Sequence, residues 1–173
     1  MRRLILMRHA SAASAPAGGE DIDRGLTASG RAEAARVGKA LARAGLIPAR
    51  ALVSAAARTR QTWEVMAPAF PGATARFDDG LYHADSGRLL ALVGAHAEDE
   101  EGDETVMILG HNPGVHAAAV QLLERAGCAP STIARVARGF PAATAVAFVV
   151  DAAGRLEYDG LFLAGDLGGG AGE

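Results

Sequence analysis

The apolar run Thr105-Val106-Met107-Ile108-Leu109 is followed at once by Gly110-His111-Asn112-Pro113-Gly114. A short, uninterrupted run of this kind has the length of a strand that is buried on both faces. Pro113 suits the first turn of a helix, which we expect to run to about Arg125. The segment therefore predicts a strand that passes directly into a helix, with His111 at the turn between them.

Similar units lie on either side of this one. Two more short buried strands are expected over Leu4–Met7 and Ala51–Ser54, and weaker strand patterns cover Thr74–Phe77, Thr144–Val150 and Arg155–Tyr158. Helices are expected over Ser29–Ala44, Ala57–Met66 and Ser86–Ala97. Because strands alternate with helices, the pattern predicts an α/β fold with a mostly parallel sheet.

Composition limits the class of protein. The 173 residues are 50% hydrophobic and 21% charged, with a formal net charge of −3, which excludes a wholly disordered chain and disfavours a general binder of nucleic acid. The single cysteine forms no intramolecular disulfide, and no apolar run approaches the roughly 20 residues of a membrane span. The first apolar run stops at Arg8, too early for a signal peptide, so we expect a cytoplasmic protein without a membrane partner.

Nothing in the sequence marks a boundary between two domains. The length suits one domain of ordinary size. We expect a single domain over residues 1–163 and a disordered, Gly-rich tail over residues 164–173.

Basic side chains follow three of the predicted strands at the point where each strand ends. Arg8 and His9 follow the first strand, Arg58 lies shortly after the second, and His111 follows the strand that ends at Leu109. Ligands of such sheets bind beyond the carboxyl ends of the strands, so these four side chains are expected at one rim. Guanidinium groups bind phosphoryl oxygens in pairs, and an imidazole can donate, accept or attack. The set predicts a phosphoryl-binding site, although each residue alone is common in purely structural positions.

No metal site is expected. His111 and His116 are five residues apart and lack both the spacing and the glutamate of a zinc-binding helix.

Four motifs occur in order along the chain. They are Leu6-Met7-Arg8-His9-Ala10, Asp23-Arg24-Gly25-Leu26-Thr27-Ala28-Ser29-Gly30, Ser54-Ala55-Ala56-Ala57-Arg58-Thr59-Arg60-Gln61-Thr62 and Gly110-His111-Asn112-Pro113-Gly114. Together they resemble the histidine phosphatase superfamily, which includes the phosphoglycerate mutases, and in particular its short, SixA-like phosphohistidine phosphatase branch. The family usually has glycine where this chain has Ala10. The resemblance extends from Leu4 to about Val150 and implies a three-layer α/β/α sandwich like that of phosphoglycerate mutase.

The resemblance also implies a mechanism. His9 would be the nucleophile and would carry a transient phosphoryl group, which water then removes. Arg8, Arg58 and a charged His111 would hold the phosphoryl oxygens and stabilise the transition state, without a metal or another cofactor.

The general acid of the family has no clear counterpart here. Many members carry a glutamate between the second arginine and the second histidine, and the matching stretch in this chain is Gly80-Leu81-Tyr82-His83-Ala84-Asp85. His83 stands at that place, and Asp79 and Asp85 are neighbouring candidates. The alternative is a site that lacks an acid.

The sequence therefore predicts a metal-independent phosphatase whose substrate is most readily a phosphohistidine in another protein. A small phosphomonoester is the alternative substrate, and the short chain favours an open site that suits a protein. A non-catalytic phosphate-binding interaction module is the alternative from another class, but such a module has no chemical need for His9. Mutase activity would need further residues that grip a sugar acid, and none is identified.

Overall fold

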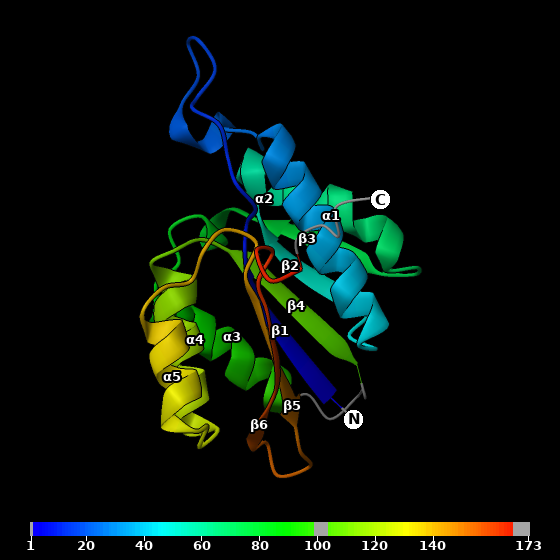
Figure 1. The fold of residues 1–173 in the computed structure, drawn as a ribbon, viewed down its shortest axis with the longest axis vertical. Helices are drawn as coiled ribbons and strands as arrows, with labels where there is room; N and C mark the ends of the chain where they lie inside the picture. The colour runs from blue at the N-terminus through cyan, green and yellow to red at the C-terminus, as the bar shows by residue number, and fades with distance from the viewer. Residues whose placement is uncertain (1, 99–103, 168–173) are drawn as a thin grey trace.

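A six-stranded sheet in the order β3-β2-β4-β1-β5-β6 runs through the middle of the molecule (Figure 1). The computed structural model describes residues 2–98 and 104–167. The strands are β1 (Arg2–Arg8), β2 (Arg50–Ser54), β3 (Thr74–Asp78), β4 (Thr105–Gly110), β5 (Ala145–Val150) and β6 (Leu156–Phe162). The helices are α1 (Ala28–Arg43), α2 (Ala57–Met66), α3 (Ser86–Glu98), α4 (Gly114–Arg125) and α5 (Pro130–Ala137).

The sheet is mostly parallel, as predicted. Strands β3, β2, β4 and β1 run in one direction, and β5 pairs antiparallel with both β1 and β6, so β5 is the one reversed strand among those described. The register sets Arg8 beside Gly110 and Val53 beside Leu109. The carboxyl ends of β1, β2 and β4 therefore meet at the same edge of the sheet.

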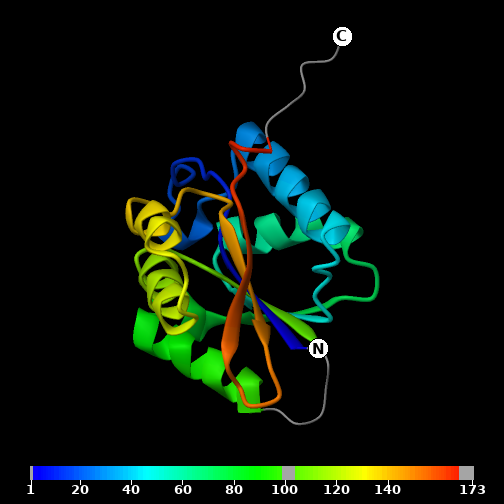
Figure 2. The same cartoon turned by 60° about the horizontal axis from the view of Figure 1, so that its bottom comes forward.

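Helices cover both faces of this sheet. Helices α1 and α2 pack on one face, and α3, α4 and α5 pack on the other (Figures 1 and 2). Along β1, Ile5 and Met7 point toward α1 and α2, while Leu4 and Leu6 point toward the opposite layer, and all four side chains are fully buried. A strand covered on both faces has no polar side, which explains its continuous apolar run. The predicted three-layer sandwich is confirmed.

Helix α1 shows how local sequence sets the ends of an element. The Thr27 hydroxyl accepts a hydrogen bond from the Gly30 amide at 2.9 Å and caps the first turn. After the last turn Gly45 has a φ of 74°, which glycine adopts without strain, and the Leu46 amide then donates to the Leu41 carbonyl at 2.9 Å. Within the described residues, no helix has the length and apolar content needed to cross a membrane.

Helix α5 is absent from the sequence-based prediction. It has only eight residues and includes the β-branched Thr132, Ile133 and Val136, so its intrinsic helix propensity is low. Packing against α4 stabilises this short helix. Nε2 of His116, on α4, lies 2.7 Å from the Val136 carbonyl oxygen.

Strand β6 is longer than predicted and continues beyond Tyr158 to Phe162. The pair Asp159-Gly160 has the composition of a turn, which would end a strand. In the structure the pairing of β6 with β5 instead shifts its register between Ala147 and Phe148, as at a β-bulge. The two strands remain paired on both sides of this shift.

The predicted tail is ordered in its first four residues. Ala164 is buried, Leu167 packs against the core under α1 and α2, and Asp166 pairs with Arg135 at 2.6 Å. Disorder is therefore the wrong prediction for residues 164–167, because they still have apolar side chains to bury. The rest of that tail, residues 168–173, lies outside the described residues.

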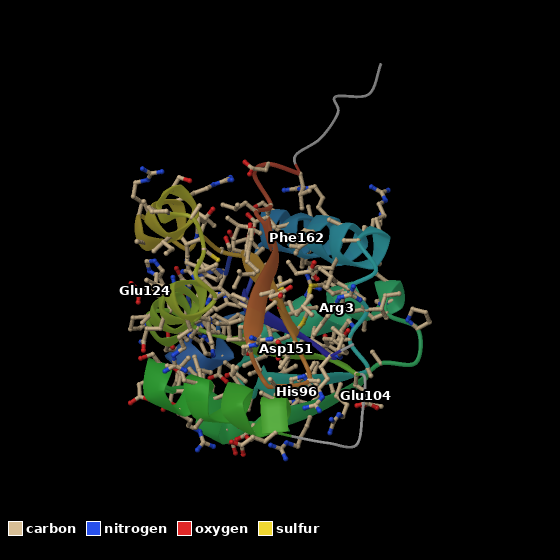
Figure 3. All side chains as sticks on the ribbon, turned by 90° about the horizontal axis from the view of Figure 1, so that it is seen from below. Arg3, His96, Glu104, Glu124, Asp151 and Phe162 are labelled. Atoms are coloured by element: carbon tan, nitrogen blue, oxygen red, sulfur yellow. The ribbon has the colours of Figure 1, made fainter. Side chains whose placement is uncertain are left out.

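The opposite edge of the sheet is built from structural contacts (Figure 3). There the Arg3 amide donates to the Glu104 carbonyl, and His96 Nε2 lies 3.3 Å from the Arg3 carbonyl oxygen. A cavity of about 590 Å³ lies near this edge, between α3, α4 and the turn from β5 to β6. Among the described residues, its lining contains no histidine, cysteine or serine.

Two glycines in helices give a test of the packing. A Cβ at Gly30 would lie 2.0 Å from the Ser11 carbonyl oxygen, whereas a Cβ at Gly94 would meet nothing within 4 Å. We expect Gly30→Ala to lower the free energy of unfolding by about 1–3 kcal/mol because the backbone must move. The control Gly94→Ala is expected to raise it by roughly 0.5–1 kcal/mol, because alanine is the better helix former. Urea unfolding measures both, and equal stability of the two variants would contradict the packing described.

Candidate active site

Three strand ends bring the predicted residues together. Arg8 and His9 leave β1, Ser54 ends β2 shortly before Arg58 in α2, and His111 follows β4. Four of these side chains, those of His9, Ser54, Arg58 and His111, are buried. The structure therefore places the predicted nucleophile, both arginines and the second histidine at one edge of the sheet.

The backbone that carries His9 is fixed from two sides. The His9 amide donates to the Gly110 carbonyl at 3.1 Å, and the Ala10 amide donates to the Thr62 hydroxyl at 3.0 Å. That hydroxyl donates in turn to the Arg58 carbonyl at 2.7 Å. The end of β1 is thus tied both to β4 and to the helix that holds Arg58.

The two nitrogens of the His9 ring have different partners. Nδ1 lies 2.7 Å from the Ala10 carbonyl oxygen, which can only accept, so Nδ1 carries the proton. Nε2 accepts a hydrogen bond from Arg58 Nε at 3.3 Å. Burial, together with the charges of Arg58 and Arg8, lowers the pKa of His9 from 6.5 to about 4, although the bond to Ala10 acts in the other direction. At neutral pH the ring is uncharged, with its lone pair on Nε2.

His111 lies beside His9, with 5.2 Å between the ring centroids. Burial, then the Arg58 charge and His9, lower the pKa of His111 to about 3. The arrangement disfavours the charged His111 that the sequence led us to expect, because a buried ring near a guanidinium favours the neutral form. Its Nε2 lies 2.7 Å from Ser54 Oγ, and its buried Nδ1 has no partner among the described residues. If the Ser54 hydroxyl donates to Nε2, Nδ1 keeps a proton that it can donate to an anion.

The two arginines reach the site from different sides. Arg58 donates through Nη1 to the Asp21 carbonyl at 2.9 Å and through Nη2 to Asp21 Oδ2 at 3.2 Å, while its Nε faces His9. Arg8 donates through Nη1 to the Phe140 carbonyl at 3.0 Å, and its buried Nε has no partner in the part of the chain that the structure describes. Both guanidinium groups are thus anchored at one end and retain N–H groups for an anion.

Tyr82 and Asp21 close one side of this group. The Tyr82 hydroxyl donates to Asp21 Oδ2, and the Tyr82 ring meets the His111 ring edge-on with centroids 5.5 Å apart. This hydrogen bond, then those from Arg24 and Arg58, hold the pKa of Asp21 well below its ordinary value. The same carboxylate raises the pKa of Tyr82. Asp21 is therefore a fixed anion at the rim.

The three candidates for a general acid have different settings. His83 and Asp85 line a cavity of about 320 Å³ together with His111. Asp85 Oδ1 accepts the Arg88 amide at 2.8 Å and so caps α3. Asp79 is exposed and does not line this cavity.

The loop of His83 is pressed against the turn of His111. A Cβ at Gly114 would lie 2.1 Å from the Ala84 carbonyl oxygen, so only glycine permits this approach. The His83 ring also lies against Tyr82, with centroids 4.1 Å apart. His83 is exposed but has a fixed place at the mouth of the site.

Four residues of the site have no role in the sequence-based prediction: Asp21, Ser54, Tyr82 and Asn112. Asn112 Nδ2 donates at 2.9 Å to the Phe140 carbonyl that also binds Arg8. Ser54, Tyr82 and Asn112 lie inside the stretches already discussed, so their positions are a usable signal. Asp21 begins a short 3-10 helix, Asp21–Asp23, and only folding brings it to Arg58.

Comparison with known proteins identifies the family. The family model described as histidine phosphatase superfamily (branch 1) matches residues 4–144, a range that contains all four motifs. The chain belongs to this histidine phosphatase superfamily. The family's fold and its SixA-like branch agree with the expectations from the sequence.

Individual relatives give more detail. The crystal structure of the putative phosphohistidine phosphatase SixA from Agrobacterium tumefaciens is 32% identical with a TM-score of 0.78, and the match covers 92% of this chain and 96% of that one. Phosphoglycerate mutase from Plasmodium falciparum, 17% identical with a TM-score of 0.61 over 91% of this chain and 87% of that one, shares the fold. An uncharacterized chloroplastic protein of Arabidopsis thaliana is 34% identical over 133 residues, or 70% of this chain, which spans 59% of that protein's length. The superfamily and the SixA neighbour support a phosphatase.

The lowered pKa values give a test of the electrostatics. We expect the ring resonances of His9 to titrate near pH 4, because burial and the arginines disfavour its protonated form. Two-dimensional NMR of the histidine rings over a pH series measures this, with His9→Ala to assign the signal. A midpoint near the ordinary value of 6.5 would contradict the neutral ring.

Proposed function

We propose that this histidine phosphatase removes the phosphoryl group from phosphohistidine in another protein, through a phosphohistidine intermediate on its own His9. The observation that carries the proposal is the state of the His9 ring. Its Nδ1–H donates a hydrogen bond to the Ala10 carbonyl, so the free lone pair is on Nε2. This nitrogen lies on the side of Arg58 and His111.

In the first step, the Nε2 lone pair attacks phosphorus. The Nε2–P bond forms while the bond between phosphorus and the substrate nitrogen breaks, and that electron pair leaves with the substrate imidazole. Arg58, Arg8 and His111 supply N–H groups to the phosphoryl oxygens, which gain charge in the transition state. Nδ1 of His9 keeps its proton and donates it to the Ala10 carbonyl, and this hydrogen bond stabilises the positive charge that develops on the ring.

In the second step, water attacks the phosphorus of phosphorylated His9. The Nε2–P bond breaks, its electron pair returns to Nε2, and inorganic phosphate and a proton are released. The ring regains the neutral state in which it began.

Several features favour a phosphohistidine substrate over an alkyl ester. In the cavity beside His111, the carboxylate of Asp85 is already used to cap α3. An alkoxide needs a proton donor because its conjugate acid has a pKa of about 15.7, whereas imidazole has a pKa of about 6.5 and leaves readily once its ring is protonated. The SixA neighbour, which matches this chain over nearly its whole length, is named for phosphohistidine.

A small phosphomonoester is the second candidate substrate. The cavity of about 320 Å³ next to His111 has room for a small leaving group, and His83 on its wall is a possible proton donor. We place either reaction in the cytoplasm, since the chain's only cysteine allows no intramolecular disulfide.

The first prediction of this proposal concerns His9. We expect His9→Ala to abolish turnover of a phosphohistidine protein, since no other group replaces the nucleophile. Wild-type enzyme labelled with radioactive phosphate is expected to lose the label in acid and to keep it in base, as a phosphoramidate does. Rapid quench at both pH values measures the label, and a parallel panel of small phosphoesters ranks the two substrate classes.

A retained fold, measured by circular dichroism, is the control for His9→Ala. Activity in this variant within about tenfold of wild type, roughly 1.4 kcal/mol of barrier, would rule out His9 as the nucleophile.

A second prediction concerns the leaving group. Without a general acid, kcat/KM for a series of esters is expected to fall steeply as the pKa of the leaving group rises. A positioned acid is typically worth about 10²–10⁴-fold and would flatten the series. A flat series that becomes steep in His83→Ala would identify His83 as a working acid, and the preference for phosphohistidine would lose its chemical basis. Asp79→Asn, which changes a carboxyl outside the cavity, is the matched control.

A further inference from the structure

The guanidinium group of Arg58 meets two different partners along two different edges. Its end-on edge, formed by Nη1 and Nη2, donates to the carbonyl and the carboxylate of Asp21 at 2.9 and 3.2 Å. Its side-on edge, formed by Nε and the second N–H of Nη2, lies toward His9, where Nε is 3.3 Å from Nε2. Asp21 thus binds the edge that does not face the nucleophile.

We propose that Asp21 is a positioning residue, which holds the end-on edge of Arg58 so that the side-on edge faces the phosphoryl group on His9. The inference rests on the proposed function, because it concerns the task of Arg58 in that reaction. A guanidinium binds two phosphoryl oxygens only when one edge is presented in the correct plane. Fixing the other edge beforehand removes the freedom that binding would otherwise have to restrict.

Asp21 is itself held in place, although its side chain is 54% exposed while that of Arg58 is 9% exposed. The Tyr82 hydroxyl donates to Oδ2, and Arg24 Nη1 donates to Oδ1 at 3.1 Å. Arg24 Nε in turn donates to the Ala13 carbonyl at 2.8 Å. These donors keep the carboxylate charged and leave it little freedom to turn away from Arg58.

A competing role for Asp21 predicts the opposite result. A carboxylate can imitate a phosphate and occupy the N–H groups that an incoming phosphoryl group needs. In that case, removing Asp21 would strengthen anion binding. The observed contacts favour positioning, because in the described part of the chain no carboxylate binds the His9-facing edge of Arg58.

The experiment compares Asp21→Ala, Asp21→Asn and Asp23→Asn. Asp23 lies in the same short 3-10 helix, where its carboxylate accepts the Glu20 amide at 2.9 Å and caps that helix. Asparagine keeps a side-chain oxygen for this hydrogen bond, so Asp23→Asn serves as the matched control. We measure kcat/KM for an aryl phosphate whose leaving group is uncharged, and we measure inhibition by vanadate. In Asp21→Ala we expect kcat/KM to fall about tenfold or more and vanadate to inhibit more weakly by a similar factor. This is the scale of a hydrogen bond to a charged group. Asp21→Asn keeps an acceptor for Nη2 and is expected to recover most of the loss, and Asp23→Asn is expected to match wild type.

A double-mutant cycle with Arg58→Lys separates positioning from a general role in the loop. Lysine has no planar edge to orient, so Asp21→Ala is expected to add little to the loss in Arg58→Lys. An equal loss in both backgrounds, or tighter vanadate inhibition of Asp21→Ala, would overturn the positioning role. Either of these results, obtained alongside an active wild-type enzyme, would leave the proposed function intact. Full activity in His9→Ala would instead overturn the proposed function itself.

Discussion

The hydrogen bond between His9 Nδ1 and the Ala10 carbonyl decides which nitrogen of the ring is free to react. The bond joins neighbouring residues and needs a defined backbone, which Gly110 and Thr62 hold from β4 and α2. The family usually has glycine at position 10, yet the methyl group of Ala10 is fully buried in the core under α1 and α2. The departure therefore leaves the carbonyl in place and adds a packing contact.

The surroundings of the ring combine two opposing demands. An anion-binding site needs positive charge, whereas a nucleophilic imidazole must stay unprotonated. Burial together with Arg58 and Arg8 meets both demands, because the same guanidinium charges that attract a phosphoryl group also lower the pKa of His9. The fixed carboxylate of Asp21 limits the excess of positive charge at the rim.

The sequence was informative wherever a local pattern determines structure. Buried strands such as Thr105–Leu109 and the capped helix after Thr27 were predictable, because their signals lie within a few adjacent residues. The common position of His9, Arg58 and His111 followed from the rule that parallel strands end at one edge. Helix α5 was not predictable, because it depends on packing against α4. The contact between Arg58 and Asp21 joins two residues 37 positions apart, and no motif in the sequence links them, so only the folded chain reveals it.

The insertion of β4 between β1 and β2 has a consequence for how the enzyme is made. His9 and Arg58 are separated by 49 positions, and Ser54 and His111 by 57, so no short piece of chain contains the site. Chain segments this far apart close slowly, since the entropy of a long loop is lost before the parallel pairing forms. During synthesis, β1 and β2 emerge before the strand that separates them and wait with unpaired edges. The reactive centre therefore cannot assemble before β4 has taken its place, and until then the nascent chain is exposed to mispairing.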